Sequence, residues 1–165
     1  MCYYIIIRGP AGAGKTEISK RLTKHLKGCH ISMDVILHKN KLDTIKGRCI
    51  PKEKFLKANK LAIPLAIKKL ESGKIVIFDG CFYHKTQIIH LTKNLPYRHF
   101  IFTLKASVGN CISRDKGRRS IGEKSIRAVH KLVSFDYGNV IIANKKTPEQ
   151  TLQTIIPYLP TSSSN

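Results

Sequence analysis

The chain has 165 residues, a length typical of one domain, and its apolar fraction of 42% excludes a disordered tail protein. No apolar run approaches the ~18 residues of a membrane span, and the first residues lack the basic segment of a secretory signal, so we expect a cytoplasmic protein without a membrane partner. The net charge of +20 attracts phosphate-bearing partners such as nucleic acid, although a general lysine bias would also produce it.

Short apolar runs alternate with longer amphipathic stretches, a pattern typical of βαβ units around a parallel sheet. The first strand is predicted at residues 3–7, followed by a helix at 14–26 and a short strand at 29–32. A long helix is then predicted at 51–72, with a disturbance at Pro64. The remaining predictions are strands at 75–78, 99–104 and 140–143, and helices at 108–116, 123–133 and 148–159. The order predicts an α/β fold, a three-layer α/β/α sandwich with a parallel five-stranded sheet.

We expect one domain over residues 1–160 and a polar tail at 161–165. The five cysteines are an odd number, lie twenty or more residues apart and form no C-x-x-C pair. The histidines show no H-E-x-x-H spacing. These patterns predict reduced thiols and argue against a structural metal site.

The sequence Gly-Pro-Ala-Gly-Ala-Gly-Lys-Thr at residues 9–16 satisfies the phosphate-binding pattern G-x-x-x-x-G-K-[ST]. It lies between the first predicted strand and the first predicted helix, which is the context that a P-loop requires. Its glycines let backbone N–H groups surround a phosphate, Lys15 is expected to reach the β- and γ-phosphates, and the Thr16 hydroxyl is expected to bind Mg²⁺. The predicted ATP-binding residues of the loop are Gly9, Ala11, Gly12, Ala13, Gly14, Lys15 and Thr16.

Two aspartates follow predicted strands, at the sheet edge where open α/β folds bind ligands. Asp79 comes directly after the strand at 75–78 and is predicted to hold Mg²⁺ together with Thr16, although Asp-Gly is also common turn chemistry. Asp34 follows the strand at 29–32 and is predicted to accept the proton of an acceptor hydroxyl. The alternative is that Asp34 or Ser32 caps the helix that follows.

A basic turn separates the helices predicted at 108–116 and 123–133. Four of the eight arginines fall between Arg114 and Arg127, in a chain where lysine is far more common. Arginine binds phosphate in a bidentate way, so we predict a lid at about residues 114–122 that stabilises charge during phosphoryl transfer. The alternative is a helix C-terminus that attracts cations through its dipole.

Taken together, the P-loop, Asp34, Asp79-Gly80 and the basic lid resemble the small P-loop kinases that include polynucleotide kinase, zeta-toxin-type and chloramphenicol-phosphotransferase-type enzymes. The resemblance spans most of the chain and implies a nucleotide-kinase-like fold, with Mg²⁺ and ATP as cofactors. It also implies that Asp34 is the acceptor base and that Arg114 and Arg118 are the lid arginines. Asn144, after the last strand, would then lie near the adenine.

Two positions depart from that family pattern. Polynucleotide kinases usually have an arginine within a few residues of the base, whereas Val35 to Lys39 here contain none, and Gly80 stands where a polar residue is usual. The resemblance as a whole leads us to expect a kinase that transfers the γ-phosphoryl group of Mg-ATP to a hydroxyl. The net positive charge makes a nucleic acid or nucleotide the first-ranked acceptor. A small metabolite or antibiotic is the second-ranked acceptor. A plain ATPase or nucleotide-gated switch is the competing class.

Overall fold

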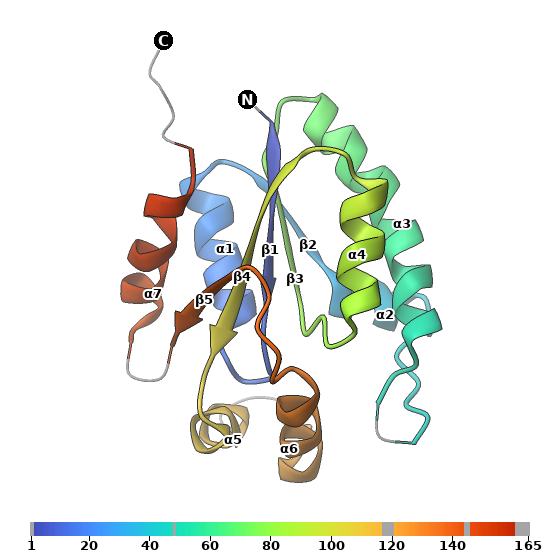
Figure 1. The fold of residues 1–165 in the computed structure, drawn as a ribbon, viewed down its shortest axis with the longest axis vertical. Coiled ribbons are helices and arrows are strands. Elements are labelled where there is room, and N and C mark those ends of the chain that lie inside the picture. The colour runs from blue at the N-terminus through green and yellow to red at the C-terminus, as the bar shows by residue number, and fades with distance from the viewer. Residues whose placement is uncertain (1, 48, 117–120, 144–145, 161–165) are drawn as a thin grey trace.

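The structure, a computed structural model, describes residues 2–47, 49–116, 121–143 and 146–160. Its centre is one sheet whose strands are all parallel, in the order β2-β3-β1-β4-β5. The strands are β1 (Tyr3–Arg8), β2 (Cys29–Ser32), β3 (Val76–Gly80), β4 (Arg98–Lys105) and β5 (Asn139–Ile142). Figure 1 shows their carboxyl ends at the bottom of the view, so the segments that follow the strands gather at that edge.

Helices cover both faces of this sheet, as Figure 1 shows. Helices α1 (Lys15–His25) and α7 (Pro148–Ile155) lie on one face, and α3 (Lys52–Glu71) and α4 (Lys85–Asn94) lie on the other. The short helix α2 (Met33–Lys39) follows β2 directly. Helices α5 (Val108–Lys116) and α6 (Glu123–Leu132) lie beyond the carboxyl ends of the strands. The predicted three-layer α/β/α sandwich with a five-stranded parallel sheet is confirmed.

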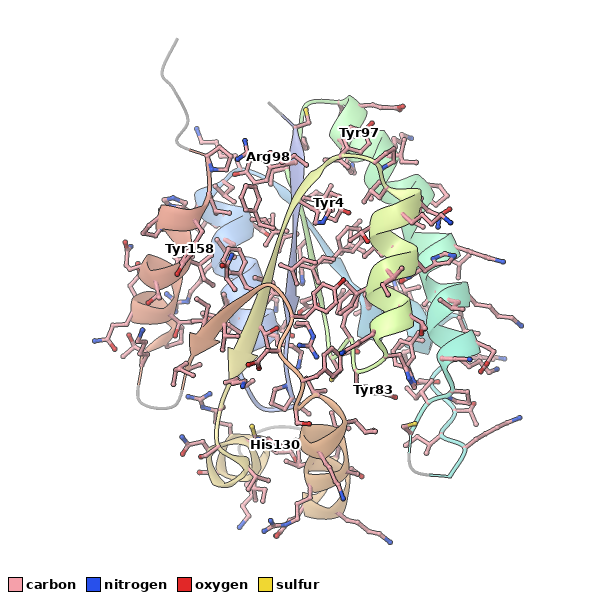
Figure 2. All side chains as sticks on the ribbon, in the orientation of Figure 1. Tyr4, Tyr83, Tyr97, Arg98, His130 and Tyr158 are labelled. Atoms are coloured by element: carbon pink, nitrogen blue, oxygen red, sulfur yellow. The ribbon has the colours of Figure 1, made fainter. Side chains whose placement is uncertain are left out.

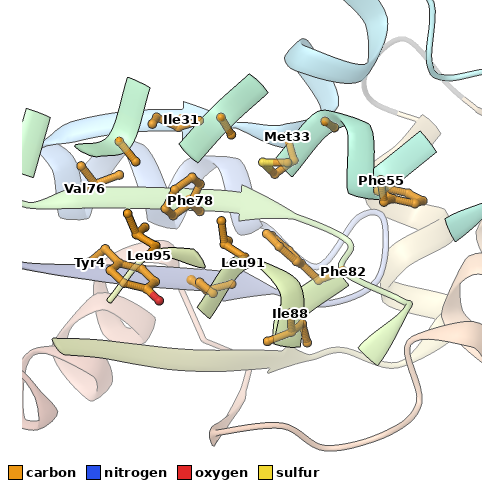
Figure 3. Packing of buried hydrophobic residues seen from close by; sticks show 14 of the residues in the cluster. Tyr4, Ile31, Met33, Phe55, Val76, Phe78, Phe82, Ile88, Leu91 and Leu95 are labelled. Carbon is orange, nitrogen blue, oxygen red and sulfur yellow. The ribbon is translucent and has the colours of Figure 1, made fainter. Parts of the chain in front are cut away.

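The central strand β1 explains why there are two cores. All six of its residues are buried, as expected for a parallel strand covered on both faces. Successive side chains alternate between the faces, so Tyr3 and Ile5 pack under α1 and α7, whereas Tyr4 and Ile6 pack under α3 and α4. Figure 3 shows Tyr4 and Phe78 in this second core. Their rings meet edge to face, with their centres 5.9 Å apart.

Several elements differ from their predicted bounds. Helix α3 runs unbroken through Pro64, because its buried row of Phe55, Ala58, Ala62, Ala66 and Leu70 packs on the sheet while Pro64 faces solvent. Helix α7 ends at Ile155 and continues as a 3₁₀ turn, since Pro157 has no N–H to extend the helix. Helix α4 was not predicted; its buried apolar residues are only Ile88 and Leu91, too few for a clear pattern.

No helix in the described part of the chain is both long enough and apolar enough to cross a membrane.

Candidate active site

The loop between β1 and α1 has a backbone that only glycine adopts easily. Gly9, Gly12 and Gly14 have φ angles of 147°, 83° and 91°. A Cβ atom on Gly9 would lie 2.5 Å from the carbonyl oxygen of Leu104, and one on Gly12 would lie 2.5 Å from that of Cys111. The loop therefore packs directly against the end of β4 and against α5, which fixes its shape.

Lys15 is placed at the start of α1 with its charged group inside this loop. Only 7% of its surface is exposed, and its Nζ donates a hydrogen bond of 2.9 Å to the carbonyl oxygen of Pro10. The helix N-cap is Gly14, which has no side-chain oxygen to satisfy the first N–H groups of α1. These N–H groups and the Lys15 ammonium together favour an anion such as a phosphate.

Asp79 is the penultimate residue of β3 and is almost completely buried, at 1% exposure. Among the described residues, neither of its carboxylate oxygens has a hydrogen-bond partner of good geometry, and His30 Nε2 lies 3.4 Å from Oδ1. Burial raises the pKa of Asp79, but polar interactions with His30, Thr16 and Ser32 outweigh it and hold the pKa below its usual value. The carboxylate is therefore ionised at neutral pH and lacks a full set of partners.

These features fit a bound divalent cation. A buried carboxylate with unsatisfied oxygens, near the Thr16 hydroxyl, offers the hard oxygen ligands that Mg²⁺ prefers. No group of three or more His, Cys, Asp or Glu side chains able to hold a metal occurs in the described part of the chain. Mg²⁺ held by Asp79 and Thr16 would therefore take its remaining ligands from phosphate oxygens and water, as it does in other nucleotide sites.

Asp34 lies in the first turn of α2, on a large cleft. The cleft has a volume of about 1160 Å³ and is lined by Lys15 and Thr16 as well as by Asp34. Ser32 is the N-cap of α2, but its side chain makes no capping hydrogen bond. The topology thus brings Asp34 to the same cleft as the P-loop, as a base for an acceptor hydroxyl requires.

Arg114 lies on the other side of the P-loop. Its guanidinium donates to the carbonyl oxygens of Gly12, at 3.4 Å, and Ala143, at 3.2 Å. It lines a smaller pocket of about 240 Å³, with Ile18 and Pro148 among the other lining residues. This pocket lies at the predicted adenine side, between the P-loop and the connection from β5 to α7. Of the other residues predicted there and on the lid, Asn144 and Arg118 lie outside the described residues.

The described part of the lid is held by specific contacts. Asp115 is 2% exposed and accepts hydrogen bonds from the N–H groups of Ile121, at 3.1 Å, and Gly122, at 3.3 Å. His130 on α6, labelled in Figure 2, lies with Nε2 2.8 Å from the carbonyl oxygen of Ala106. The buried Asp115 carboxylate thus links the end of α5 to residues 121–122, just before α6, a role that was not predicted from the sequence.

A buried arginine connects the segment between α6 and β5 to the start of the P-loop. Arg8 is fully buried, donates to Thr103 Oγ1 at 2.9 Å and to the carbonyl oxygen of Phe135 at 2.8 Å, and has its guanidinium 4.1 Å from the centre of the Phe135 ring. Burial lowers its pKa to about 10, although Asp136 opposes this, so Arg8 remains charged at neutral pH. The segment that joins α6 to β5 is therefore fixed to the residue just before Gly9.

Several residues of the site were not predicted from the sequence. His30 contacts Asp79, and the cleft also receives Ile50, Phe55 and Tyr83 from three separate segments. Figure 2 labels Tyr83, which follows β3 near the carboxyl edge of the sheet. Nothing in the local pattern marks these common apolar residues, because only the tertiary fold brings them together.

Comparison with known proteins identifies the family and the fold. The chain matches the family described as AAA domain over residues 5–133. No curated protein matches the sequence.

Solved structures of similar fold include a sugar kinase from a Janibacter species, with 14% identity, a TM-score of 0.79, and coverage of 96% of this chain and 94% of that one. A gluconokinase from Sinorhizobium meliloti has 11% identity and a TM-score of 0.71 over 91% and 87% of the two chains. The tunicamycin resistance protein of Deinococcus radiodurans has 15% identity and a TM-score of 0.69 over 96% and 95%. The predicted P-loop fold is confirmed by both comparisons. The chain therefore belongs to the AAA domain family and has the fold of a small P-loop kinase.

Proposed function

We propose that the protein transfers the γ-phosphoryl group of ATP to a hydroxyl group of a small molecule. The observation that carries this proposal is the single cleft of about 1160 Å³, to which the P-loop contributes Lys15 and Thr16 and α2 contributes Asp34. A phosphate donor and a hydroxyl acceptor can meet only if one space holds both the phosphate-binding groups and a base. The kinase descriptions of the structurally similar proteins support the same reaction class.

In this reaction the bond between the γ-phosphorus and the β,γ-bridging oxygen breaks, and a bond from that phosphorus to the acceptor oxygen forms. Asp34 takes the acceptor proton, and ADP leaves. Lys15 and the N–H groups of the P-loop neutralise the β- and γ-phosphates, while lid arginines, Arg118 among them, stabilise charge in the transition state. Bound at Thr16 and Asp79, Mg²⁺ would supply further charge neutralisation.

The nucleotide base would occupy the smaller pocket beside Arg114. That pocket borders the P-loop through Gly14, so a base there leaves the triphosphate free to run along the loop towards Lys15. Arg114 is tied to Gly12 and Ala143 and therefore acts here as a nucleotide-positioning residue. Asn144 would contribute to the same side.

A nucleic-acid or nucleotide acceptor is the second candidate, and the net charge of +20 favours it. The structurally similar proteins include a sugar kinase and a gluconokinase, so we rank a small-molecule acceptor first. The two candidates differ in their response to salt, because phosphate contacts weaken steeply between ~50 and ~200 mM salt.

The test is transfer of label from γ-labelled ATP, with Mg²⁺, to a panel of acceptors. The panel contains neutral alcohols, sugars, gluconate, nucleosides and 5′-hydroxyl oligonucleotides. We expect label in a small molecule at a rate that hardly changes with salt. Label in oligonucleotides alone, lost as salt rises, would establish the second candidate instead. Release of inorganic phosphate at the same rate with and without every acceptor would indicate an ATPase or a switch.

A further inference from the structure

The acceptor side of the cleft has a chemical character of its own, and the inference drawn from it rests on the proposed function. We call the described cleft-lining residues of 34–55 and 81–83 the acceptor wall. They come from α2, the segment after it, the start of α3 and the segment after β3. All of them lie outside the P-loop and the lid, so this wall is what an acceptor would meet.

The charged side chains described on the acceptor wall are acidic, in contrast to the net positive charge of the chain. The charged residues described on this wall are Asp34 and Asp43, whereas the lysines that line the same cleft, Lys15, Lys20 and Lys124, lie on α1 and α6. A hydrogen bond with His38, 2.8 Å from Asp43 Oδ2, holds the pKa of Asp43 below its usual value. A wall with two carboxylates repels phosphate or carboxylate groups, even though the whole chain carries +20.

The rest of the acceptor wall is mainly apolar. Leu37, Phe55 and Tyr83 are buried at its base, and Phe55 and Tyr83 meet edge to face at 5.0 Å. At its rim, Ile45 is 61% exposed, and Ile121, which lines the same cleft from the lid, is 50% exposed. Binding of a ligand that covers exposed apolar side chains around a cleft is favourable, because it removes apolar surface from water.

This surface is preorganised. The Tyr83 hydroxyl accepts a hydrogen bond of 2.9 Å from the backbone N–H of Ile50, and His84 Nε2 lies 3.1 Å from the carbonyl oxygen of the same residue. The segment before α3 is thereby attached to the segment after β3. An apolar ligand would meet a surface whose shape is already set, which lowers the entropic cost of binding.

We propose that the phosphoryl acceptor is an uncharged alcohol whose hydroxyl is carried by an aromatic or branched aliphatic body. The body would pack on Phe55, Tyr83 and Ile45, and the hydroxyl would face Asp34. Phosphoryl transfer to it follows the balance given above, with the hydroxyl proton passing to the Asp34 carboxylate and ADP as the leaving group.

Two alcohols that differ only in the apolar body test this proposal. We would compare 1-phenyl-1,2-ethanediol with ethylene glycol, and both with gluconate and a 5′-hydroxyl oligonucleotide, as acceptors of label from ATP. The expected kcat/KM is at least about tenfold higher for the phenyl compound than for ethylene glycol, because one apolar group in a pocket discriminates at this scale. Equal kcat/KM for the two alcohols, or higher kcat/KM for gluconate or the oligonucleotide, would overturn the proposal.

Variants at the rim separate this proposal from the function on which it rests. Ile45→Ser and Ile121→Ser are expected to lower the preference for the phenyl compound at least threefold in kcat/KM. Ile89→Ser, an equally exposed isoleucine on α4 outside the cleft, is the matched control and should not change it. An unchanged preference in both rim variants would contradict an apolar acceptor site.

Failure of the acceptor proposal and failure of the kinase proposal give different results. If the protein transfers label to gluconate or the oligonucleotide, the kinase proposal stands and the acceptor proposal falls. If no acceptor on the panel is labelled and Mg-ATP does not bind, the kinase proposal itself falls, and the acceptor proposal falls with it.

Discussion

The phosphate end of the cleft and its acceptor end are built in different ways. At the phosphate end, residues 9–16 form one continuous segment whose geometry is set by backbone angles and by close contacts of Gly9 and Gly12. The acceptor end is assembled from segments between residues 34 and 83, and most of its side chains are ordinary apolar ones. The proposed phosphate binding is therefore a local property of the chain, whereas the proposed acceptor recognition depends on the tertiary fold.

The largest expected effect comes from Asp34, at the acceptor end. Asp34→Asn removes the proposed proton acceptor and should lower kcat by roughly 10²–10⁴-fold, the usual contribution of a positioned base. The affinity for Mg-ATP should hardly change, because Asp34 belongs to the acceptor wall. Transfer rates and titration calorimetry measure the two quantities. Glu71→Gln, at the end of α3 and outside the cleft, serves as the control. Full turnover in Asp34→Asn would show that the base is another group.

The opposite pattern is expected at the phosphate end. Lys15→Met removes a buried ammonium that we propose faces the phosphates, and it should weaken Mg-ATP binding by roughly 10- to 100-fold, the equivalent of one or two charge-assisted hydrogen bonds. Lys24→Met, in the exposed last turn of the same helix, should bind Mg-ATP like the wild type. Titration calorimetry distinguishes them. Equal affinities in the two variants would mean that Lys15 does not face the nucleotide.

A smaller effect tests whether close contacts shape the P-loop. Gly12 and Gly73 have nearly the same φ angles, 83° and 80°, but a Cβ on Gly12 would clash with Cys111 while one on Gly73 would meet nothing within 4 Å. Gly73→Ala should lower the free energy of unfolding by about 1 kcal/mol through backbone strain alone. Gly12→Ala should lower the free energy of unfolding by about 1–3 kcal/mol more than Gly73→Ala does, because its Cβ overpacks the contact with Cys111. Equal losses of unfolding free energy in the two variants, measured by denaturant unfolding, would show that the loop accommodates the added Cβ without destabilising the fold.

The smallest expected effect concerns pH. Because the pKa of Asp79 lies below its ordinary value of 3.8 in the folded protein, its ionised form stabilises the fold at pH values above 3.8. That contribution is lost as the pH falls from 3.8 through the folded pKa. The difference in unfolding free energy between the wild type and Asp79→Asn should therefore stay constant from pH 8 to about pH 5 and change only below about pH 4. A change centred near neutral pH would contradict this assignment to Asp79.

The same contrast explains how much of the molecule could be predicted from its sequence. The strands and the P-loop were predictable because a buried parallel strand is a continuous apolar run and a P-loop is a contiguous motif. Helix α4 was missed because few apolar residues define it. The acceptor wall was not predictable, since Phe55 and Tyr83 are typical core residues in sequence and come together only after α3 packs beside β3. Arg8 likewise stands in an apolar strand with no local sign that it will contact Phe135.

A methyl NMR spectrum of protein labelled at its isoleucines tests most directly whether the nucleotide and the acceptor bind at separate places. Ile18 lines the smaller pocket beside Arg114, whereas Ile45 and Ile50 line the acceptor side of the large cleft. A non-hydrolysable ATP analogue with Mg²⁺ should shift the Ile18 methyl signal, and 1-phenyl-1,2-ethanediol added afterwards should shift the signals of Ile45 and Ile50 and leave that of Ile18 unchanged. Separate binding places would be contradicted if the alcohol shifted the Ile18 methyl signal, or if neither the Ile45 nor the Ile50 signal shifted when the alcohol was added to the protein with bound analogue.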